Sequence, residues 1–258
     1  RNGDQKEQTP LMYAHLERFI RFRNLCIILE TGLLQSFPAA KTIQLNRIVG
    51  SLIDKGIALN QAQINNKNGD SKLPYILHIE IQKSLLNVLK CVILAVGGNI
   101  LTCSKDICDI LWKCLKSTNI SYDELKADSN SSLRKIVYDV LNVFLRIAPN
   151  NHFMYKNMEN LIKEAFVDIT PIQSEIVLSL PQASGEKSKK KKKENAMRKT
   201  ISGNAIDKSL HLHQMLCSMS LEFLRNLLLF NGAAMKPVLL KILQDKILVT
   251  TRSEERRV

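Results

Sequence analysis

The strongest pattern of apolar and polar positions lies between Pro74 and Lys116. Apolar residues recur there every three or four positions, which places them on one face of a helix. Further apolar residues widen this face, as is typical of a helix that is covered on more than one side. The apolar residues concerned are Leu77, Ile79, Ile81, Leu85, Leu86, Val88, Leu89, Val92, Ile93 and Val96.

Gly97-Gly98-Asn99 predicts the end of this helix, because glycine and asparagine accept the left-handed backbone found at many helix ends. A second helix is expected at once, with Ser104 as its N-cap and Asp106 in its first turn. The two helices would form an antiparallel hairpin. The apolar run from Cys91 to Val96 is shorter than the roughly 20 residues that a bilayer requires, so no membrane span is expected.

The same helical spacing recurs in three further pairs of segments. Glycine and proline are sparse and lie mostly between these segments, which favours helices over a β-sandwich with its frequent turns. The expected helices are 11–34 and 39–60, 133–148 and 153–167, and 208–230 and 237–249. We therefore predict an all-α fold, a HEAT or armadillo-like solenoid of antiparallel helix pairs. Because the pitch is irregular and the pairs share no tight consensus, a helical bundle without repeats is the alternative.

The order of apolar and charged segments predicts five regions. Residues 1–10 are polar and expected to be disordered, and residues 11–170 form a helical-repeat domain of three helix pairs. A disordered, Lys-rich linker covers 171–206, a closing helix pair over 207–250 packs on the same array, and 251–258 form a charged tail. Since the chain begins with arginine and ends in charge, we expect it to be a fragment of a longer protein.

Positive charge is concentrated in the predicted linker. The net charge of the chain is +13, and residues 185–199 carry eight basic residues against two glutamates. This segment resembles a nuclear-import signal, because extended basic side chains can lie in an acidic receptor groove. A solvating linker and an RNA contact that weakens steeply with salt are the alternatives. The basic residues are Lys187, Lys189, Lys190, Lys191, Lys192, Lys193, Arg198 and Lys199.

The cysteines and histidines do not form a metal-binding pattern. Cys103, Cys108 and Cys114 lack the CxxC spacing of a zinc knuckle, so we expect them to be core thiols. His211 and His213 stand two positions apart and would point about 200° away from each other on a helix, so a site with Cys217 is not favoured. Six cysteines without a disulfide pattern indicate a reducing, intracellular compartment.

No enzyme signature is found in the sequence. It contains no Gly-rich phosphate loop, nucleophile elbow, HExxH motif or dinucleotide fingerprint. We therefore expect no enzymatic activity, no catalytic residues and no cofactor. Leu224, Leu227 and Leu228 fit the LxxLL pattern of helices that dock in a receptor groove, although the same spacing is expected of leucines in a helical core.

Short segments along most of the chain carry a family resemblance. They are Leu33-Leu-Gln-Ser-Phe-Pro38, the helix from Pro74 that ends in Ala95-Val-Gly-Gly-Asn99, the 133–148 helix, Val167-Asp-Ile-Thr-Pro171, the Lys-rich linker and the closing hairpin with Leu229-Phe-Asn-Gly232. In this order they resemble the central Rix-type region of the proline-, glutamic acid- and leucine-rich protein family. The likeness rests on element order and scattered short matches, without a single diagnostic motif.

The resemblance implies a nuclear and nucleolar scaffold for ribosomal RNA processing and maturation of the large ribosomal subunit. Its implied partners are a WD-repeat propeller subunit, a second helical-repeat subunit, the midasin ATPase, a SUMO protease and the pre-60S particle, and it implies self-association. The family's acidic tail, earlier repeats and further LxxLL motifs have no counterpart here. A nuclear-receptor coregulator and a nuclear-transport or RNA-binding helical repeat are the alternative functions.

Overall fold

The computed structural model describes residues 5–35, 43–57, 75–118, 124–170 and 213–245. Every regular element within these ranges is a helix, which confirms the predicted all-α class. The elements are α1 Gln5–Leu34, the π-helix η1 Arg47–Asp54, α3 Tyr75–Val96, the 3-10 helix η2 Gly97–Cys103, α4 Ser104–Ser117, α5 Glu124–Ile147, α6 His152–Ile169, the helix 213–231, the 3-10 helix η3 Gly232–Ala234 and the helix 237–245.

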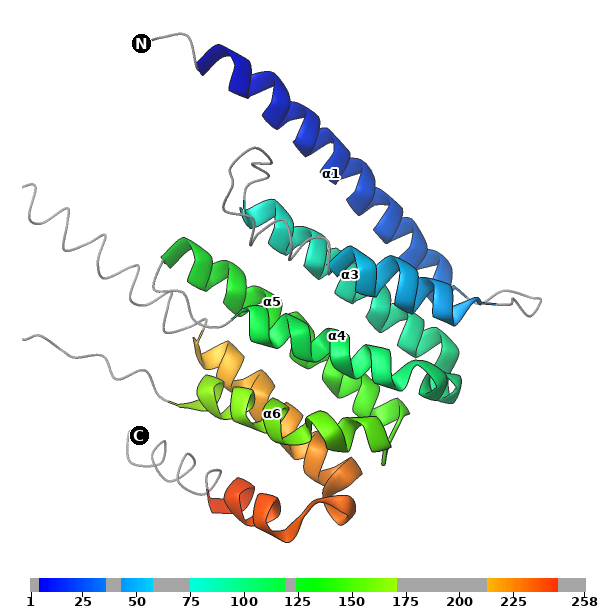
Figure 1. Cartoon of the computed structure of the whole chain (residues 1–258), viewed down its shortest axis with the longest axis vertical. Coiled ribbons are helices and arrows are strands. Elements are labelled where there is room, and N and C mark those ends of the chain that lie inside the picture. Colours follow the sequence, from blue (N-terminus) through cyan, green and yellow to red (C-terminus); the bar gives the residue numbers. More distant parts are fainter. Residues whose placement is uncertain (1–4, 36–42, 58–74, 119–123, 171–212, 246–258) are drawn as a thin grey trace, which may run out of the picture.

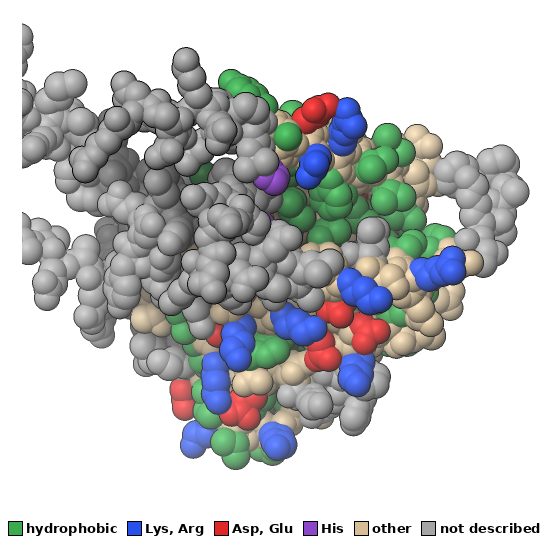
Figure 2. Space-filling model, turned by 45° about the horizontal axis from the view of Figure 1, so that its top comes forward, with side chains coloured by type: hydrophobic (Ala, Val, Ile, Leu, Met, Phe, Trp, Pro, Cys, Tyr) green, Lys and Arg blue, Asp and Glu red, His purple; other side chains and the backbone are tan. Residues whose placement is uncertain are grey.

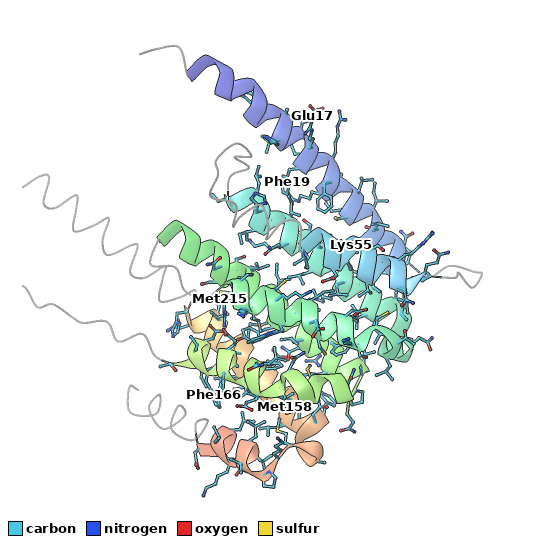
Figure 3. The ribbon with its side chains drawn as sticks, viewed as in Figure 1. Glu17, Phe19, Lys55, Met158, Phe166 and Met215 are labelled. Atoms are coloured by element: carbon cyan, nitrogen blue, oxygen red, sulfur yellow. The ribbon has the colours of Figure 1, made fainter. Side chains whose placement is uncertain are left out.

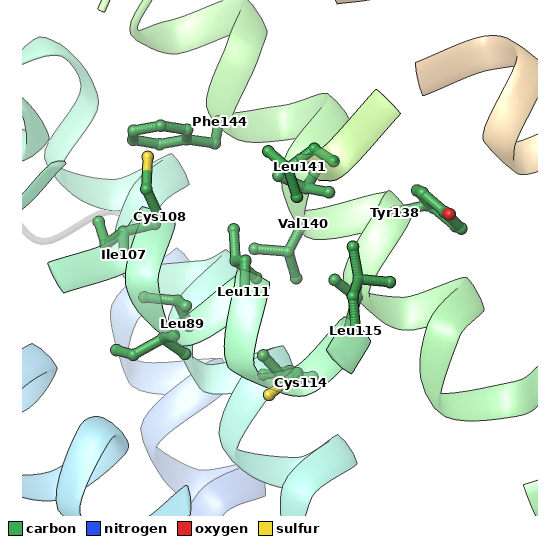
Figure 4. Packing of buried hydrophobic residues seen from close by; sticks show 14 of the residues in the cluster. Leu89, Ile107, Cys108, Leu111, Cys114, Leu115, Tyr138, Val140, Leu141 and Phe144 are labelled. Carbon is green, nitrogen blue, oxygen red and sulfur yellow. The ribbon is translucent and has the colours of Figure 1, made fainter. Parts of the chain in front are cut away.

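The helices are arranged in two layers (Figure 1). In one layer α3 lies between α1 and α5, and in the other α4 contacts both η1 and α6. The layers meet where α4 packs against α5. Figure 4 shows the side chains of α4 and α5 that meet at this contact.

The helix 213–231 packs against α5, although a long segment separates the two in the sequence. The rings of Tyr138 and Phe223 lie with their centroids 5.6 Å apart. The amide of Asn226 donates a hydrogen bond of 3.0 Å to the side-chain oxygen of Asn142, and both side chains are buried. Arg146 forms an exposed ion pair of 3.0 Å with Glu222. These contacts pack the helix 213–231 directly onto α5.

The apolar faces predicted for α3 and α5 are the centre of the core. In α3 seven residues between 79 and 93 from the predicted face are buried, because α1 and α5 cover this helix from two sides. In α5 the predicted residues are also buried: Leu133, Val137, Val140, Leu141, Phe144 and Leu145. The spacing of apolar residues was sufficient to predict which side chains of α3 and α5 are buried. Each helix turns its apolar residues to a neighbouring helix at every turn.

The turn between α3 and α4 agrees with the prediction at one end and differs at the other. Gly97 follows α3 with a φ of 59°, the left-handed backbone that glycine accepts without strain. Ser104, however, is not the N-cap, and the prediction is wrong there. The N-cap is Cys103, and the Ser104 hydroxyl instead donates to the carbonyl of Leu101 at 2.8 Å. Because η2 runs directly into α4, backbone carbonyls of the 3-10 helix replace a side-chain cap.

Two helices begin earlier than their apolar pattern does. α1 starts at Gln5, so the prediction of disorder over 1–10 is wrong for residues 5–10. α5 starts at Glu124, ahead of the predicted start at Leu133. Both extensions contain glutamate and lysine, which favour helix formation without any apolar periodicity. A search for apolar spacing alone misses such turns.

Several predictions concern residues outside the described ranges. They include the break at Phe37-Pro38, the linker over 171–206 and the charged tail over 251–258. The end of the final helix near Val249 also lies outside them. The predicted 39–60 helix is described over 45–57, where η1 widens it into a π-helix that the sequence did not indicate.

By length and apolar composition alone, one described stretch, Ile76–Ser117, could cross a membrane. It is not one straight rod, because the chain turns through η2 between α3 and α4. The apolar residues of α3 lie against α1 and α5, and those of α4 against α5 and α6. A core helix satisfies the same composition test, and 44% of the most apolar window of this stretch is buried within the protein.

Candidate protein-binding surface

The first helix exposes large apolar side chains over residues 13–34. Tyr13, Leu16, Ile20, Ile27 and Leu34 follow one another at intervals of three, four, seven and seven residues, and each is more than 40% exposed. This spacing puts them in one line along the helix, as in a heptad pattern. We call these five residues the α1 stripe.

The side of α1 next to the stripe is already occupied. Cys26 is buried, and Phe22 and Leu33 are partly buried against the core, so this side faces α3. In Figure 3 the Glu17 side chain lies on the side of α1 away from α3, and Phe19 lies on the nearer side. The stripe is therefore a second apolar face that the fold leaves uncovered.

Residues 25–29 add further exposed apolar surface, because they are apolar on all sides of α1. Only Cys26 is buried among them, whereas Leu25, Ile27, Ile28 and Leu29 are 61%, 47%, 65% and 42% exposed. A helix that is apolar all round is normally buried on all sides, and monomeric proteins rarely leave contiguous apolar patches of this kind in water. Figure 2 shows hydrophobic side chains gathered on the upper part of the molecule, where α1 lies.

The charged residues of α1 are mainly basic. Arg18, Arg21 and Arg23 are exposed, and Arg21 donates to Glu17 at 2.6 Å. Arg18 and Arg23 form no ion pair with any residue that the structure describes. Glu30 is half-buried, and burial raises its pKa. The uncovered side of α1 therefore combines an apolar line with arginines that lack a carboxylate partner among the described residues.

A second group of polar residues is buried where α4, α5 and α6 meet. The Arg134 guanidinium donates through Nε to both oxygens of Asp168 at 3.0 Å, and through its terminal nitrogens to the Leu115 carbonyl at 3.0 Å and to Glu164 at 3.0 Å. The Tyr138 hydroxyl also donates to Asp168. Arg134 and Asp168 are each about one-twentieth exposed. We call Arg134, Tyr138, Glu164 and Asp168 the ion cluster.

The protonation of the ion cluster follows from its burial and its charges. Burial alone would lower the pKa of Arg134, but its interactions with Tyr138, Asp168 and Glu164 outweigh burial and raise it, so Arg134 stays cationic. Burial raises the pKa of Asp168, and Arg134 opposes this shift. Burial also raises the pKa of the Tyr138 hydroxyl, which therefore remains a donor. Because Arg134 pairs with two carboxylates and also donates to the Leu115 carbonyl, the cluster joins three helices and is a structural element.

All six cysteines lie in the described ranges, and none forms a disulfide. Cys103, Cys108 and Cys114 are buried in the core, which confirms the prediction made for them. Burial raises the pKa of Cys26 to about 11 and the pKa of Cys108 and Cys114 to about 12. Within the described residues, no group of three His, Cys, Asp or Glu side chains is placed to hold a metal ion.

This burial predicts a large difference in thiol reactivity. At pH 8 an ordinary cysteine is about one-quarter thiolate, whereas a thiol with a pKa near 12 is thiolate in only about one molecule in 10,000. We expect N-ethylmaleimide to modify half-buried Cys217 first and to reach Cys108 and Cys114 only on unfolding. Peptide mass spectrometry of a labelling time course checks the order. Equal labelling rates in the native protein would contradict the packing of α4.

The sequence-based candidate residues do not meet in one site. Leu224 and Leu227 are fully buried and Leu228 is partly buried against the core, so the LxxLL leucines pack the closing helix onto the array. Docking through them would require this helix to detach. The basic segment from Lys187 to Lys199 lies outside the described residues, as does His211.

The α1 stripe was not singled out as a surface from the sequence. Two sequence signals for it are the heptad spacing of its five residues and the run of five apolar residues over 25–29, which exceeds what a half-buried helix needs. Comparisons of the chain with known protein families, with curated proteins and with solved structures give no match.

Proposed function

We propose that this chain is a non-enzymatic scaffold that holds partner proteins on a helical array. The observation that carries this proposal is the α1 stripe, because an uncovered apolar helix face is characteristic of a protein-binding surface. The buried ion pair and the buried thiols also support a function without catalysis. The Arg134–Asp168 pair of the ion cluster is buried, and the thiols of Cys108 and Cys114 are held in their neutral form.

The array is proposed to be a HEAT or armadillo-like solenoid. Its support is the alternation of helices between two layers, with α1, α3 and α5 side by side in one layer and η1, α4 and α6 in the other. In a solenoid each helix pair contacts mainly its neighbours, and a broad outer surface is left for binding. The contacts between α5 and the helix 213–231 extend the same layer by one further helix.

The biological setting is proposed from the family resemblance of the short segments described above. On that basis the chain is a nuclear and nucleolar subunit of a Rix-type complex in pre-60S maturation and ribosomal RNA processing. The propeller subunit, the second helical-repeat subunit, midasin and the SUMO protease are its proposed partners. The basic segment from Lys187 to Lys199 would serve nuclear import or a transient RNA contact.

The alternative function with a specific observation behind it is RNA binding or nuclear transport, which the net charge of +13 favours. Salt separates the two functions. Binding of proteins through an apolar surface survives moderate salt, whereas binding to phosphates weakens by orders of magnitude. The coregulator alternative is less well supported, because two of the three LxxLL leucines are buried.

Affinity purification of the tagged chain from nuclear extract, with and without RNase, tests the proposal. We expect the propeller subunit and pre-60S factors to be recovered, and recovery of the direct protein partners to resist RNase and moderate salt. Recovery of neither the propeller subunit nor pre-60S factors would refute the ribosome-assembly function. Recovery that disappears entirely with RNase would favour the RNA-binding alternative.

A further inference from the structure

The neighbours of α3 show what a fully covered helix of this layer looks like. Residues 85–93 of α3 are almost continuously apolar, and most of them are buried because α1 lies on one side and α5 on the other. Residues 25–29 of α1 have the same all-round apolar composition. Among the helices that the structure describes, however, α3 is the one that lies beside α1 in this layer.

The uncovered side of α1 therefore resembles the apolar helix faces that already pack together twice in this layer, between α1 and α3 and between α3 and α5. What such an interface accepts is another helix, because a helix presents apolar residues at the matching spacing of three and four. The α1 stripe has the heptad spacing that lets two helices interlock along several turns.

The charged residues on the stripe restrict which helices can bind there. Within the heptad spacing of the stripe, positions 23 and 30 fall on the same line. They hold an exposed arginine and a half-buried glutamate. Arg23 is exposed and has no carboxylate partner among the described residues. A helix lying on the stripe would desolvate this guanidinium, which is costly unless the helix brings a carboxylate to it.

We propose that the α1 stripe is the docking site for an amphipathic helix of a partner protein, with leucine-type residues facing the stripe and a glutamate or aspartate facing Arg23. This proposal rests on the scaffold function and specifies the kind of partner that α1 receives. The stripe supplies the apolar contact area, and Arg23 selects the charge and the register of the bound helix.

Two synthetic helical peptides test the proposal with the full chain. Each spans about three heptads with leucine at the inward positions; one carries glutamate and the other lysine at the position that would face Arg23. Fluorescence anisotropy measures binding of the labelled peptides. We expect the glutamate peptide to bind at least about 10-fold more tightly than the lysine peptide, the factor that corresponds to about 1.4 kcal/mol.

Variants of the chain locate the contact. Ile20→Asn with Ile27→Asn should abolish binding of the glutamate peptide, because both side chains are about half exposed within the stripe. Leu229→Asn with Val238→Asn is the matched control, since these side chains are 65% and 72% exposed away from α1 and should leave binding unchanged. Arg23→Glu should reverse the preference and bind the lysine peptide.

Several outcomes would overturn the proposal. They are binding of neither peptide, equal loss of binding in the stripe and control variants, or an unchanged preference in Arg23→Glu. Light scattering after gel filtration measures whether the chain forms a dimer. A dimer that dissociates in the Ile20→Asn and Ile27→Asn variant would mean that a second copy of the chain occupies the stripe. Failure of the nuclear affinity purification with intact peptide binding would instead refute the ribosome-assembly function alone.

Discussion

Replacing Arg134 by alanine is expected to lower the free energy of unfolding by about 3–5 kcal/mol, the range found when one partner of a buried ion pair is removed. Without the guanidinium, the carboxylates of Asp168 and Glu164 lose their cation inside the core. The Leu115 carbonyl also loses a donor, so α4, α5 and α6 are no longer joined at this point. Urea denaturation followed by far-UV circular dichroism measures the change.

An exposed arginine of the same helix is the control. Arg146 pairs with Glu222 at 3.0 Å, but both side chains are about half exposed, so Arg146→Ala should cost less than about 1 kcal/mol. Exchanging Arg134 and Asp168 together for apolar residues should restore part of the lost stability. Neither member of the buried pair is then left in the core without its partner. A cost below about 1 kcal/mol for Arg134→Ala would show that the ion cluster is hydrated.

Replacing Phe223 by alanine should destabilise the protein to a similar degree, by about 3–5 kcal/mol. Its ring is fully buried and lies 5.6 Å, centroid to centroid, from the ring of Tyr138 in α5. The substitution would leave a cavity between the closing helix and the array. Because one core spans both, the variant should still unfold in a single transition, at a lower urea concentration.

Leu229→Ala is the matched substitution on the same helix. This leucine is 65% exposed, so its loss should change the unfolding free energy by no more than about 0.5 kcal/mol. The comparison also tests the closing helix as part of the array. An early, separate unfolding step in the wild-type protein, or equal effects of the two substitutions, would contradict the contact between α5 and the helix 213–231.

Both experiments concern contacts that link distant parts of the chain, and such contacts were not predictable from spacing. Arg134 lies within the predicted 133–148 helix and Asp168 one residue past the predicted 153–167 helix, in the last turn of α6. Nothing in either segment of the sequence indicates that they pair. The same holds for Phe223 and Tyr138. A buried pair depends on the angle and offset at which two helices cross, and many offsets satisfy the same amphipathic pattern.

The amino-acid sequence by itself determined where the helices of the core lie and which side of α3 and α5 is buried. It also determined that the chain leaves α3 at Gly97, and that Cys103, Cys108 and Cys114 belong to the interior. These are local properties: the period of a helix and the backbone freedom of glycine act over a few residues, so they can be read without knowing the neighbours.

Only the tertiary structure decided that the apolar stripe of α1 is left uncovered and that the leucines of the closing helix are covered. The leucines at 224 and 227 and the isoleucines at 20 and 27 look alike in the sequence, but the first two are buried and the others are exposed. It likewise decided that η2 replaces the cap expected at Ser104. The physical reason is that burial of a face depends on whether another helix reaches it, and that is a property of the whole arrangement of helices.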